Sequence, residues 1–385
     1  MTKNSKSGDY FSKRIGRALK TFILYIKNEV IPFISKTLDR IPYKKIRFIY
    51  PFAALLNILL LVYVVYNVFL DKNTWEDGKE KMIVIEKGSG FNEIVQTLLK
   101  NDVIENGFTF KTAAILTRRD GSIFPRKYIF QSGLSNGEIL DMLTDSELNQ
   151  TVKFRVPEGI KLKTLAKSVE KRFLIPEEDF IKATQNRSVM TGLGLGENVK
   201  DLEGFLYPDT YVMSINLSGD GVVKVFTDEF KRRVINDEEL INALRLRRET
   251  LLEAVTLASI IEAETAMKSE MPRISGVYHN RLNRRMRLEA DPTVQYVLPG
   301  GHKSRLLFED LRIDSPYNTY RNYGLPPGPI NNPGIEAIRA AIFPESHNFV
   351  FFVATGDGGH TFTETFEQHK EAAREYRRKL DQKNK

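Results

Sequence analysis

The longest apolar stretch of the chain lies near its N-terminus and predicts a membrane helix. Residues 48–70 form a mostly apolar run of 23 residues without a charge, and the next charged side chain is Asp71. At about 1.5 Å per residue, such a helix spans roughly 34 Å, slightly more than the ~30 Å hydrocarbon core of a bilayer. Because a buried soluble helix of this length almost always carries some charge, the run is interpreted as a transmembrane helix.

Shorter patterns follow this run and predict a small α+β module. Residues 71–80 are polar and are interpreted as a linker. Within residues 81–150, the strand-like sequence MIVIE is followed by a glycine turn and by apolar residues at helical spacing. Ser135 and Glu138 have the spacing of a capping box and predict the start of another helix.

Residues 151–385 mix strand-like and helix-like patterns and predict a larger α+β domain. Residues 202–213 (LEGFLYPDTYVM) bring aromatic, glycine and acidic residues together. Sugar sites use such flat apolar faces beside hydrogen-bonding acids, but the pattern also fits core packing with a turn. Residues 314–334 are rich in Tyr, Asn, Gly and Pro and predict a long ordered loop, which usually has a function.

The segment ETLLEAVTLASIIEAET, residues 249–265, predicts a helix that is apolar on nearly every side. At about 100° per residue, Glu264 prolongs the apolar stripe of Leu257 and Ile261, whereas Glu262 points to the opposite side. Apolar surroundings disfavour a charged carboxylate and raise its pKa, as a general acid near neutral pH requires. Glu264 is therefore the candidate acid, and the alternative is a solvated charge at a helix end.

The net charge of +8 is concentrated at the N-terminus. Residues 1–47 hold twelve Lys or Arg against three acidic residues, so this arm carries +9 and the remaining chain −1. Basic residues accumulate on the cytoplasmic side of membrane helices, so the arm is expected in the cytoplasm and residues 71–385 on the opposite side of the membrane. The arm is amphipathic and suits an anionic inner leaflet, and nucleic-acid binding is not expected. No small-residue cleavage site follows the apolar run, which is therefore interpreted as a retained anchor.

Several other chemistries lack their motifs in this sequence. The absence of cysteine excludes disulfides and thiolate catalysis, and no GxSxG nucleophile motif occurs. The glycines of residues 191–197 follow a helical pattern and lack the Lys-Ser/Thr ending of a phosphate loop. Neither a metal nor another cofactor is expected, because the histidines do not have the spacing of metal ligands. These are His279, His302, His347, His360 and His369.

Five segments, taken in chain order, resemble one known family. They are EGFLYPDTY, IIEAET, RLNRRMRLEADPTVQY, SPYNTYRNYGLPPGPINNPG and GGHTF. They are similar to segments of the endolytic murein transglycosylases of the MltG (YceG-like) type, over roughly residues 81–385. The resemblance implies a LysM-like module at residues 81–150 and a catalytic domain at residues 151–385. The basic arm is longer than the tail usual in the family.

The resemblance also implies a reaction and a site. The family uses one glutamate in a Glu-Thr step, which matches Glu264 and Thr265 here. The implied reaction cleaves the MurNAc-β-1,4-GlcNAc bond of peptidoglycan without water and leaves 1,6-anhydro-MurNAc ends, with Glu264 acting as acid and then as base. The candidate substrate-binding residues are Glu203, Tyr207, Asp209, Asp291, Tyr317, Asn318, Tyr320 and His360.

Two other functions remain open from the sequence. A non-catalytic scaffold would only hold glycan, and a hydrolytic muramidase would need a second carboxylate, for which Asp209, Glu203 and Asp291 are candidates. Each candidate binding residue also has a structural alternative as a loop acid, a core ring or a turn residue. The expected partners are peptidoglycan strands and the inner (cell) membrane, with proteins of wall synthesis as further candidates. The catalytic domain is expected in the periplasm.

Overall fold

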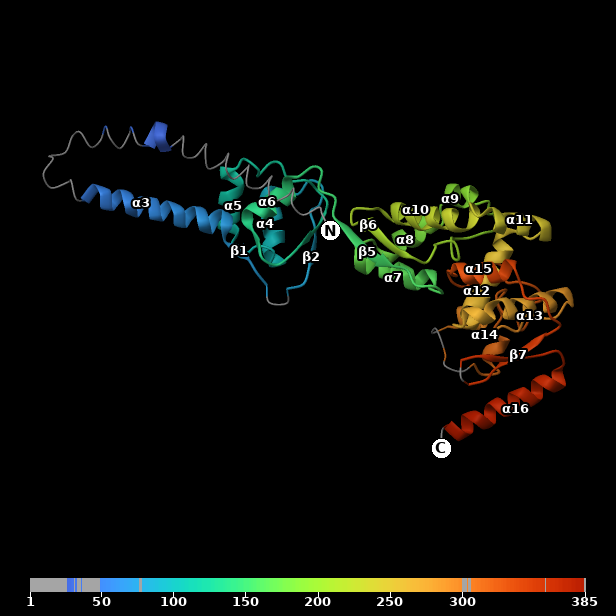
Figure 1. Ribbon diagram of the computed structural model, residues 1–385. Coiled ribbons are helices and arrows are strands. Elements are labelled where there is room, and N and C mark those ends of the chain that lie inside the picture. Colours follow the sequence, from blue (N-terminus) through green and yellow to red (C-terminus); the bar gives the residue numbers. More distant parts are fainter. Residues whose placement is uncertain are drawn as a thin grey trace. The chain divides into compact units, whose positions relative to one another are not determined.

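The computed structural model divides the chain into two compact units, which are taken in turn (Figure 1). The first comprises Met1–Pro125 and Ile129–Ser146, and the second comprises Arg126–Tyr128 and Glu147–Lys385. The structure describes residues 26–30, 32, 36, 49–75, 78–299, 303, 306–356 and 358–383. Most of the basic arm, with its predicted amphipathic helix, lies outside the described residues.

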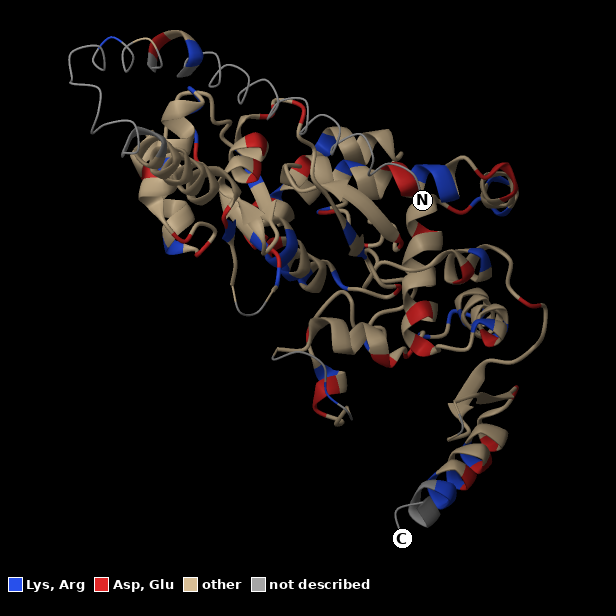
Figure 2. Cartoon of the chain, turned by 60° about the vertical axis from the view of Figure 1, so that its left-hand side comes forward, with Lys and Arg blue, Asp and Glu red and all other residues tan. Residues whose placement is uncertain are grey.

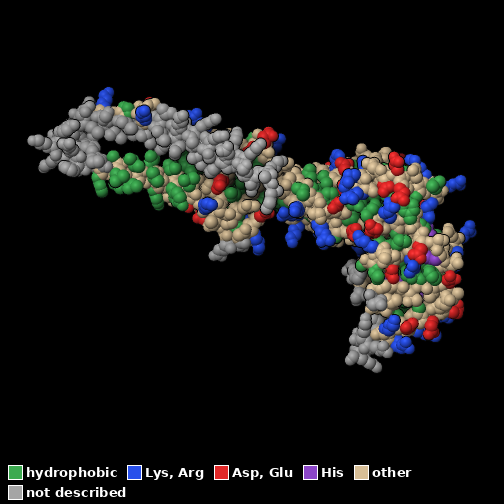
Figure 3. Space-filling view, in the orientation of Figure 1, with side chains coloured by type: hydrophobic (Ala, Val, Ile, Leu, Met, Phe, Trp, Pro, Cys, Tyr) green, Lys and Arg blue, Asp and Glu red, His purple; other side chains and the backbone are tan. Residues whose placement is uncertain are grey.

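The first unit begins with one long apolar helix. Helix α3 (Ile49–Val65) continues as the π-helical segment η2 (Tyr66–Leu70). Over Phe52–Leu70 the mean hydropathy is 2.3 and only 6% of the residues are buried, so apolar side chains cover the outside (Figure 3). By length and composition, this is a helix that could cross a membrane, where the sequence predicts one.

The rest of the first unit is a small α+β arrangement of short elements. Strands β2 and β3 pair, as do β1 and β4, and the first two residues of β3 are counted in the second unit. The predicted capping box is present, because Glu138 accepts a hydrogen bond from the backbone N–H of Ser135 at 2.8 Å. The elements are β1 (Lys72–Asn73), β2 (Lys81–Val84), α4 (Phe91–Lys100), α5 (Gly107–Leu116), β3 (Lys127–Phe130), β4 (Leu134–Ser135) and α6 (Asn136–Thr144).

The second unit opens with a two-stranded antiparallel sheet covered by helices. Strand β5 pairs with β6, with Phe154 opposite Tyr211. Phe154 packs edge-on against Phe173 at 5.2 Å, which anchors the first helix to the sheet. The elements are β5 (Thr151–Arg155), α7 (Leu162–Phe173), α8 (Glu177–Thr184), α9 (Arg187–Gly192), β6 (Thr210–Ser214), α10 (Gly219–Phe230), η3 (Lys231–Ile235) and α11 (Glu238–Arg247).

Helix α12 is the centre of the remaining part of the second unit. All eight residues from Ala254 to Ile261 are buried, which explains why the sequence is apolar on nearly every side. Helices α13, α14 and α15 pack against it. The elements are α12 (Leu251–Glu264), η4 (Lys268–Glu270), α13 (Met271–Asn283), α14 (Asp291–Val297), η5 (Asp310–Arg312), α15 (Ile335–Ile342), β7 (Phe351–Ala354), β8 (His360–Thr363) and α16 (Phe366–Lys383).

The loop at residues 314–334 passes between α12 and the segment before β6. Asn332 is fully buried, and its side-chain oxygen accepts from the N–H groups of Gly204 and Leu206, both at 3.0 Å. Gly204 has φ +88°, and a Cβ there would lie 2.5 Å from Pro329, so only glycine allows this approach. Residues 202–208 are therefore core, the structural alternative that the sequence left open.

The expected mixture of helix and strand is present, but helices dominate and every sheet of the described chain has only two strands. The C-terminal helix α16 carries both signs of charge along its length, as its sequence predicts (Figure 2). Small sheets cannot form a core by themselves. The buried helix α12 takes that role, and it also carries the candidate acid.

Candidate active site

Glu264 is the last residue of α12, and the backbone changes direction directly after it. Thr265 is extended, with φ −146° and ψ 139°, and its hydroxyl accepts from the N–H of Met267 at 3.0 Å. The β-branched Thr265 is buried and favours this extended backbone. The half-buried Glu264 is thereby fixed at the end of a rigid helix, with part of its surface open to solvent.

Tyr278 of α13 holds the Glu264 carboxyl. Its hydroxyl donates to Oε1 of Glu264 at 2.6 Å, a short distance typical of a strong hydrogen bond to a carboxylate. The Tyr278 side chain is buried, and its ring meets that of Phe352 in β7 edge-on at 5.9 Å. Because the ring is packed, the hydroxyl has little freedom to leave the carboxyl.

Burial raises the pKa of Glu264 to about 7, against an ordinary value of 4.5. The hydrogen bond from Tyr278 works in the opposite direction, because it favours the charged form. The charge of Asp291 raises the pKa further, and that of Arg281 lowers it. Near neutral pH the carboxyl therefore populates both its protonated and its ionised form, as a group that gives and takes a proton requires.

Arg281 is a buried cation, and its positive charge lowers the pKa of Glu264. It lies on α13, and its Nε donates to the carbonyl of Val350 at 2.7 Å. Its Nη1 donates to the carbonyl of Leu288 at 2.8 Å, and to Glu289 at 3.3 Å. These bonds tie α13 to the segments before β7 and α14, so the positive charge is fixed in position.

Asp291 and Tyr320 interact electrostatically with Glu264. The hydroxyl of Tyr320 donates to Oδ1 of Asp291 at 2.6 Å, and Asp291 is exposed at the start of α14. Burial raises the pKa of Tyr320, and the negative charge of Glu264 raises it further. Glu264, Asp291 and Tyr320, all predicted from the sequence as site residues, thus interact electrostatically with one another.

Glu262 has a different environment from Glu264. Its Oε2 accepts from the N–H of Gly334, the residue that precedes α15, at 3.0 Å. Burial raises its pKa, and the bond from Gly334 lowers it. The two carboxylates contact different elements, α15 and α13, in agreement with the opposite directions predicted from the helix geometry.

Glu203 is buried, and its hydrogen-bond partners do not include Glu262 or Glu264. Its Oε1 accepts from the N–H of Leu162 at 2.7 Å and from the side chain of Asn332 at 3.3 Å. Its Oε2 accepts from the hydroxyl of Tyr296 at 3.4 Å. Burial raises the pKa of Glu203 to about 8, so this carboxyl is mostly neutral at pH 7. The hydrogen bond from Leu162 fixes the first residue of α7 to this carboxyl.

The remaining predicted residues are divided between the core and the surface. Tyr207 is buried, and its carbonyl accepts from the hydroxyl of Tyr211 at 2.5 Å. Asp209 forms an ion pair with Arg233 at 3.6 Å. The ring of Tyr317 packs against Tyr296 at 5.0 Å, on the side of Glu203. No contact in the described chain joins these three residues to Glu264.

Asn318 and His360 have partners within the protein. Asn318 is fully buried, and its amide donates to the carbonyls of Leu311 and Ile313 at 3.0 and 2.8 Å. These two hydrogen bonds shape the loop. The Nδ1 of His360 lies 2.8 Å from Oε2 of Glu270, and its ring packs against Phe352.

Sequence reasoning missed Tyr278, Arg281 and Glu270. Tyr278 and Arg281 lie on the amphipathic helix after Glu264, where an aromatic residue and an arginine are ordinary. The spacing of 14 residues between Glu264 and Tyr278 bridges two helices and follows no periodicity. Only the packing of α13 beside α12 brings the hydroxyl to the carboxyl.

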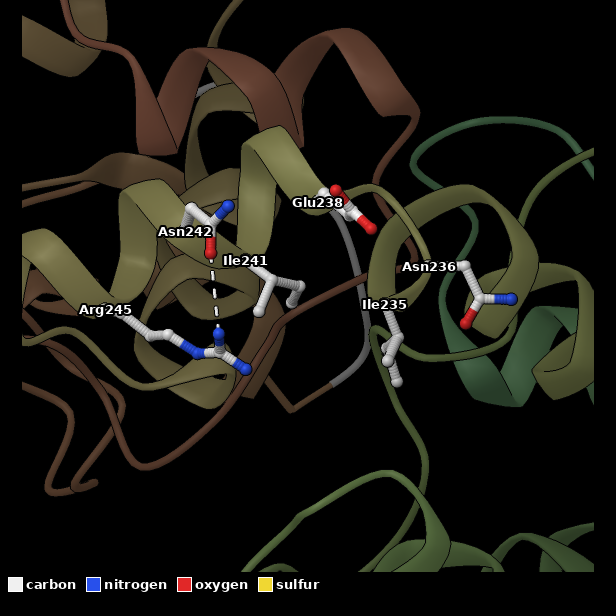
Figure 4. Close-up of a pocket in the computed structure, with 6 residues that line it drawn as sticks. All are labelled: Ile235, Asn236, Glu238, Ile241, Asn242 and Arg245. Carbon is white, nitrogen blue, oxygen red and sulfur yellow. Dashed lines mark hydrogen bonds between the residues drawn. The ribbon is translucent and has the colours of Figure 1, made fainter.

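Two hollows of the described chain lie away from the candidate residues. One lies along η3 and α11, with a volume of about 520 Å³ (Figure 4). Asn242 and Arg245 bond each other there at 3.4 Å, and none of the candidate residues lines it. Within the described residues, no group of three or more Asp, Glu or His side chains is placed to hold a metal ion.

The fold and the site define a mixed α+β protein with a half-buried acid at a helix end, and known proteins are similar to it in sequence. The profile of the YceG-like family matches residues 83–375. The chain belongs to the YceG-like family.

Several named proteins are also similar to this chain in sequence. A protein of Bacillus subtilis named endolytic murein transglycosylase is 32% identical over 308 residues, which cover 76% of this chain and 84% of the relative. A protein of the same name from Streptococcus pneumoniae is 28% identical, and the match covers 76% of this chain but 58% of that relative. A crystal structure of a putative yceG-like protein from Listeria monocytogenes is 28% identical, with a TM-score of 0.54 over 77% of this chain and 99% of that one.

Exchange of Glu203 for glutamine tests the buried carboxyl. Between pH ~5 and ~8 the folded chain binds a proton at Glu203 that the unfolded chain releases, so stability falls as pH rises. This slope is at most about 1.4 kcal/mol per pH unit. Glu203→Gln should remove it, with the clearest effect between pH 7 and 8, when unfolding of the full chain is followed at each pH.

Glu264→Gln is the matched control for this measurement. The pKa of Glu264 is about 7, so its loss should flatten the slope below pH 7 and leave it unchanged above. An unaltered pH dependence of stability in Glu203→Gln would show that Glu203 is ionised in the folded chain.

Proposed function

We propose that this chain is an endolytic lytic transglycosylase that cleaves peptidoglycan glycan strands. Its family and the names of its relatives support a transglycosylase acting on murein. The observation that carries the proposal is the carboxyl of Glu264, which burial brings to a pKa of about 7 and Tyr278 holds at 2.6 Å. Such a carboxyl can protonate a leaving group at neutral pH and accept a proton afterwards.

In the first step, protonated Glu264 donates its proton to the oxygen that joins C1 of MurNAc to C4 of GlcNAc. The C1–O bond breaks, the GlcNAc chain leaves as an alcohol, and positive charge develops at C1. The N-acetyl group of MurNAc stabilises this charge. The Tyr278 hydroxyl stabilises the carboxylate that Glu264 becomes, because its hydrogen bond is stronger to a charged acceptor.

In the second step, the Glu264 carboxylate accepts the proton of the C6 hydroxyl of the same MurNAc. The oxygen O6 then bonds to C1 and closes the 1,6-anhydro ring. One bond is broken and one is formed, no water is consumed, and Glu264 is protonated again for the next cycle. A single carboxylate serves both steps because the substrate supplies its own nucleophile.

Sugar binding is proposed for the residues on the open side of Glu264. Asp291 is exposed and Tyr320 is bonded to it, so both can meet sugar hydroxyls beside the reacting bond. Tyr317 and His360 are half-buried and are proposed to contact neighbouring sugars. Glu203, Tyr207 and Asn318 are buried and are proposed to act by supporting the segments that carry the sugar-binding residues.

The N-terminal part is proposed to place the enzyme at the membrane. Residues 52–70 would span the inner (cell) membrane, with the +9 arm in the cytoplasm and residues 71–385 in the periplasm. Residues 81–150 are proposed to form a LysM-like glycan-binding module. The order of strand, two helices and strand, with β2 and β3 paired, supports this interpretation.

A hydrolytic muramidase is the second candidate, and one observation favours it. Asp291 is a second carboxylate whose charge acts on Glu264, and two carboxylates with a water molecule between or beside them define ordinary glycosidases. A hydrolase and a lytic transglycosylase leave different sugar ends, so their products distinguish them.

Digestion of peptidoglycan by the full chain should produce anhydro ends. If O6 captures C1 before water reaches it, new 1,6-anhydro-MurNAc ends should exceed new reducing ends roughly tenfold or more. Mass spectrometry of the products, after reduction with borohydride to mark the reducing ends, gives this ratio. Mostly reducing ends would establish the muramidase, and unchanged glycan length the scaffold.

Paired glutamine variants separate the two carboxylates of α12. Glu264→Gln keeps the shape of the side chain but cannot transfer a proton, so turnover should fall by roughly 10²–10⁴ or more. Glu262→Gln keeps an oxygen that can accept from Gly334, so it should cost under tenfold in rate and about 1 kcal/mol in stability.

Turnover, melting temperature and glycan binding should be measured for both variants. Glycan binding by Glu264→Gln should persist, because the amide resembles the protonated acid. A folded but inactive Glu262→Gln beside an active Glu264→Gln would mean that the catalytic acid has been chosen wrongly.

A further inference from the structure

Helix α5 of the first unit is apolar on two opposite faces. Its inner face is formed by Phe110, Ala113 and Ala114, which are fully buried. Its outer face presents Phe108, Ile115 and Leu116, which are 78%, 59% and 65% exposed. The half-buried Thr112 lies between them, and its hydroxyl donates to the carbonyl of Phe108 at 2.8 Å. At about 100° per residue the three apolar side chains lie within one arc of roughly 100°. A helix on a soluble surface presents a polar outer face, so this apolar face calls for a partner.

The position of α5 indicates which partner this is. The helix packs against η2, the C-terminal end of the apolar span (Figure 1). Val68 of η2 is buried in the same unit, and its carbonyl accepts from the side chain of Asn136 in α6 at 3.1 Å. Gly137 approaches so closely that a Cβ would lie 3.3 Å from the carbonyl of Phe69. The end of the span is therefore built into the unit that carries α5.

We propose that Phe108, Ile115 and Leu116 insert into the membrane surface beside the span, so that α5 is a second, shallow membrane contact. The inference rests on the proposed membrane anchor and adds a lipid-binding face to it. Where η2 emerges from the bilayer, α5 is held at the level of the headgroups, and Figure 1 shows it running across the end of α3.

The chemistry of α5 suits this depth. Apolar helix faces at interfaces are buried ~5–10 Å, at the boundary of headgroups and acyl chains. Lys111 on α5 and Arg118 just after it supply basic groups that can reach anionic headgroups while their stems stay among lipid. Bilayer lipid, and not a second protein, is therefore the occupant that the face fits.

The cysteine-free chain permits a direct test with single cysteine labels. The full chain, reconstituted in vesicles of phosphatidylethanolamine and phosphatidylglycerol, carries an environment-sensitive fluorophore at Phe108→Cys or Ile115→Cys. Gln96→Cys, on the exposed polar face of α4, is the matched control, and Leu59→Cys reports on the span. Nitroxide lipids labelled near the headgroup or near the acyl end quench from within the bilayer, and iodide quenches from water.

Labels at positions 108 and 115 should shift to shorter emission wavelengths and be quenched by the shallow nitroxide lipid, whereas the label at position 96 should be quenched by iodide. Phe108→Ser with Leu116→Ser should weaken lipid quenching at position 115. Labels at 108 and 115 that iodide reaches, with position 59 quenched by the deep nitroxide, would overturn the α5 contact alone. A label at position 59 outside lipid would overturn the anchor itself. Labels shielded from both quenchers would assign the face to a protein partner or a second copy.

Discussion

The hydrogen bond from Tyr278 to Glu264, 2.6 Å long, is the interaction on which the proposed chemistry depends. Burial alone would hold the carboxyl neutral and make it a poor proton donor, whereas the hydrogen bond from the phenol favours the ionised form. The balance of the two, with the opposing charges of Asp291 and Arg281, gives a pKa of about 7. One carboxyl can then donate a proton and take one back within a single cycle.

The surrounding fold serves to keep that balance fixed. Helix α12 is buried from Ala254 to Ile261, so the carboxyl at its end has a rigid support. The loop at residues 314–334 is locked against it from the other side, where the hydroxyl of Ser259 accepts from the N–H of Ile330 at 3.0 Å. The same loop carries Tyr320 to Asp291, next to the acid. Asn332 extends this chain of contacts to the segment around Gly204.

Structural features that depend on residues a few positions apart could be predicted from the sequence. Contacts between distant segments could not. The apolar span, the capping box at Ser135 and the opposite directions of Glu262 and Glu264 follow from helical geometry and agree with the structure. The burial of Asn318 could not be predicted, because a buried amide inside a loop and an exposed one have the same local sequence. Tyr278 was missed because only the packing of two helices gives it a role.

Titration of the Glu264 carboxyl tests this account most directly. The infrared difference between the wild-type chain and Glu264→Gln isolates the signal of this one acid, which can be followed from pH 4 to 9. The account predicts a pKa of about 7, and a higher value in Tyr278→Phe, because the hydrogen bond that lowers the pKa is then lost. An ordinary value near 4.5, or an unchanged pKa in Tyr278→Phe, would contradict it.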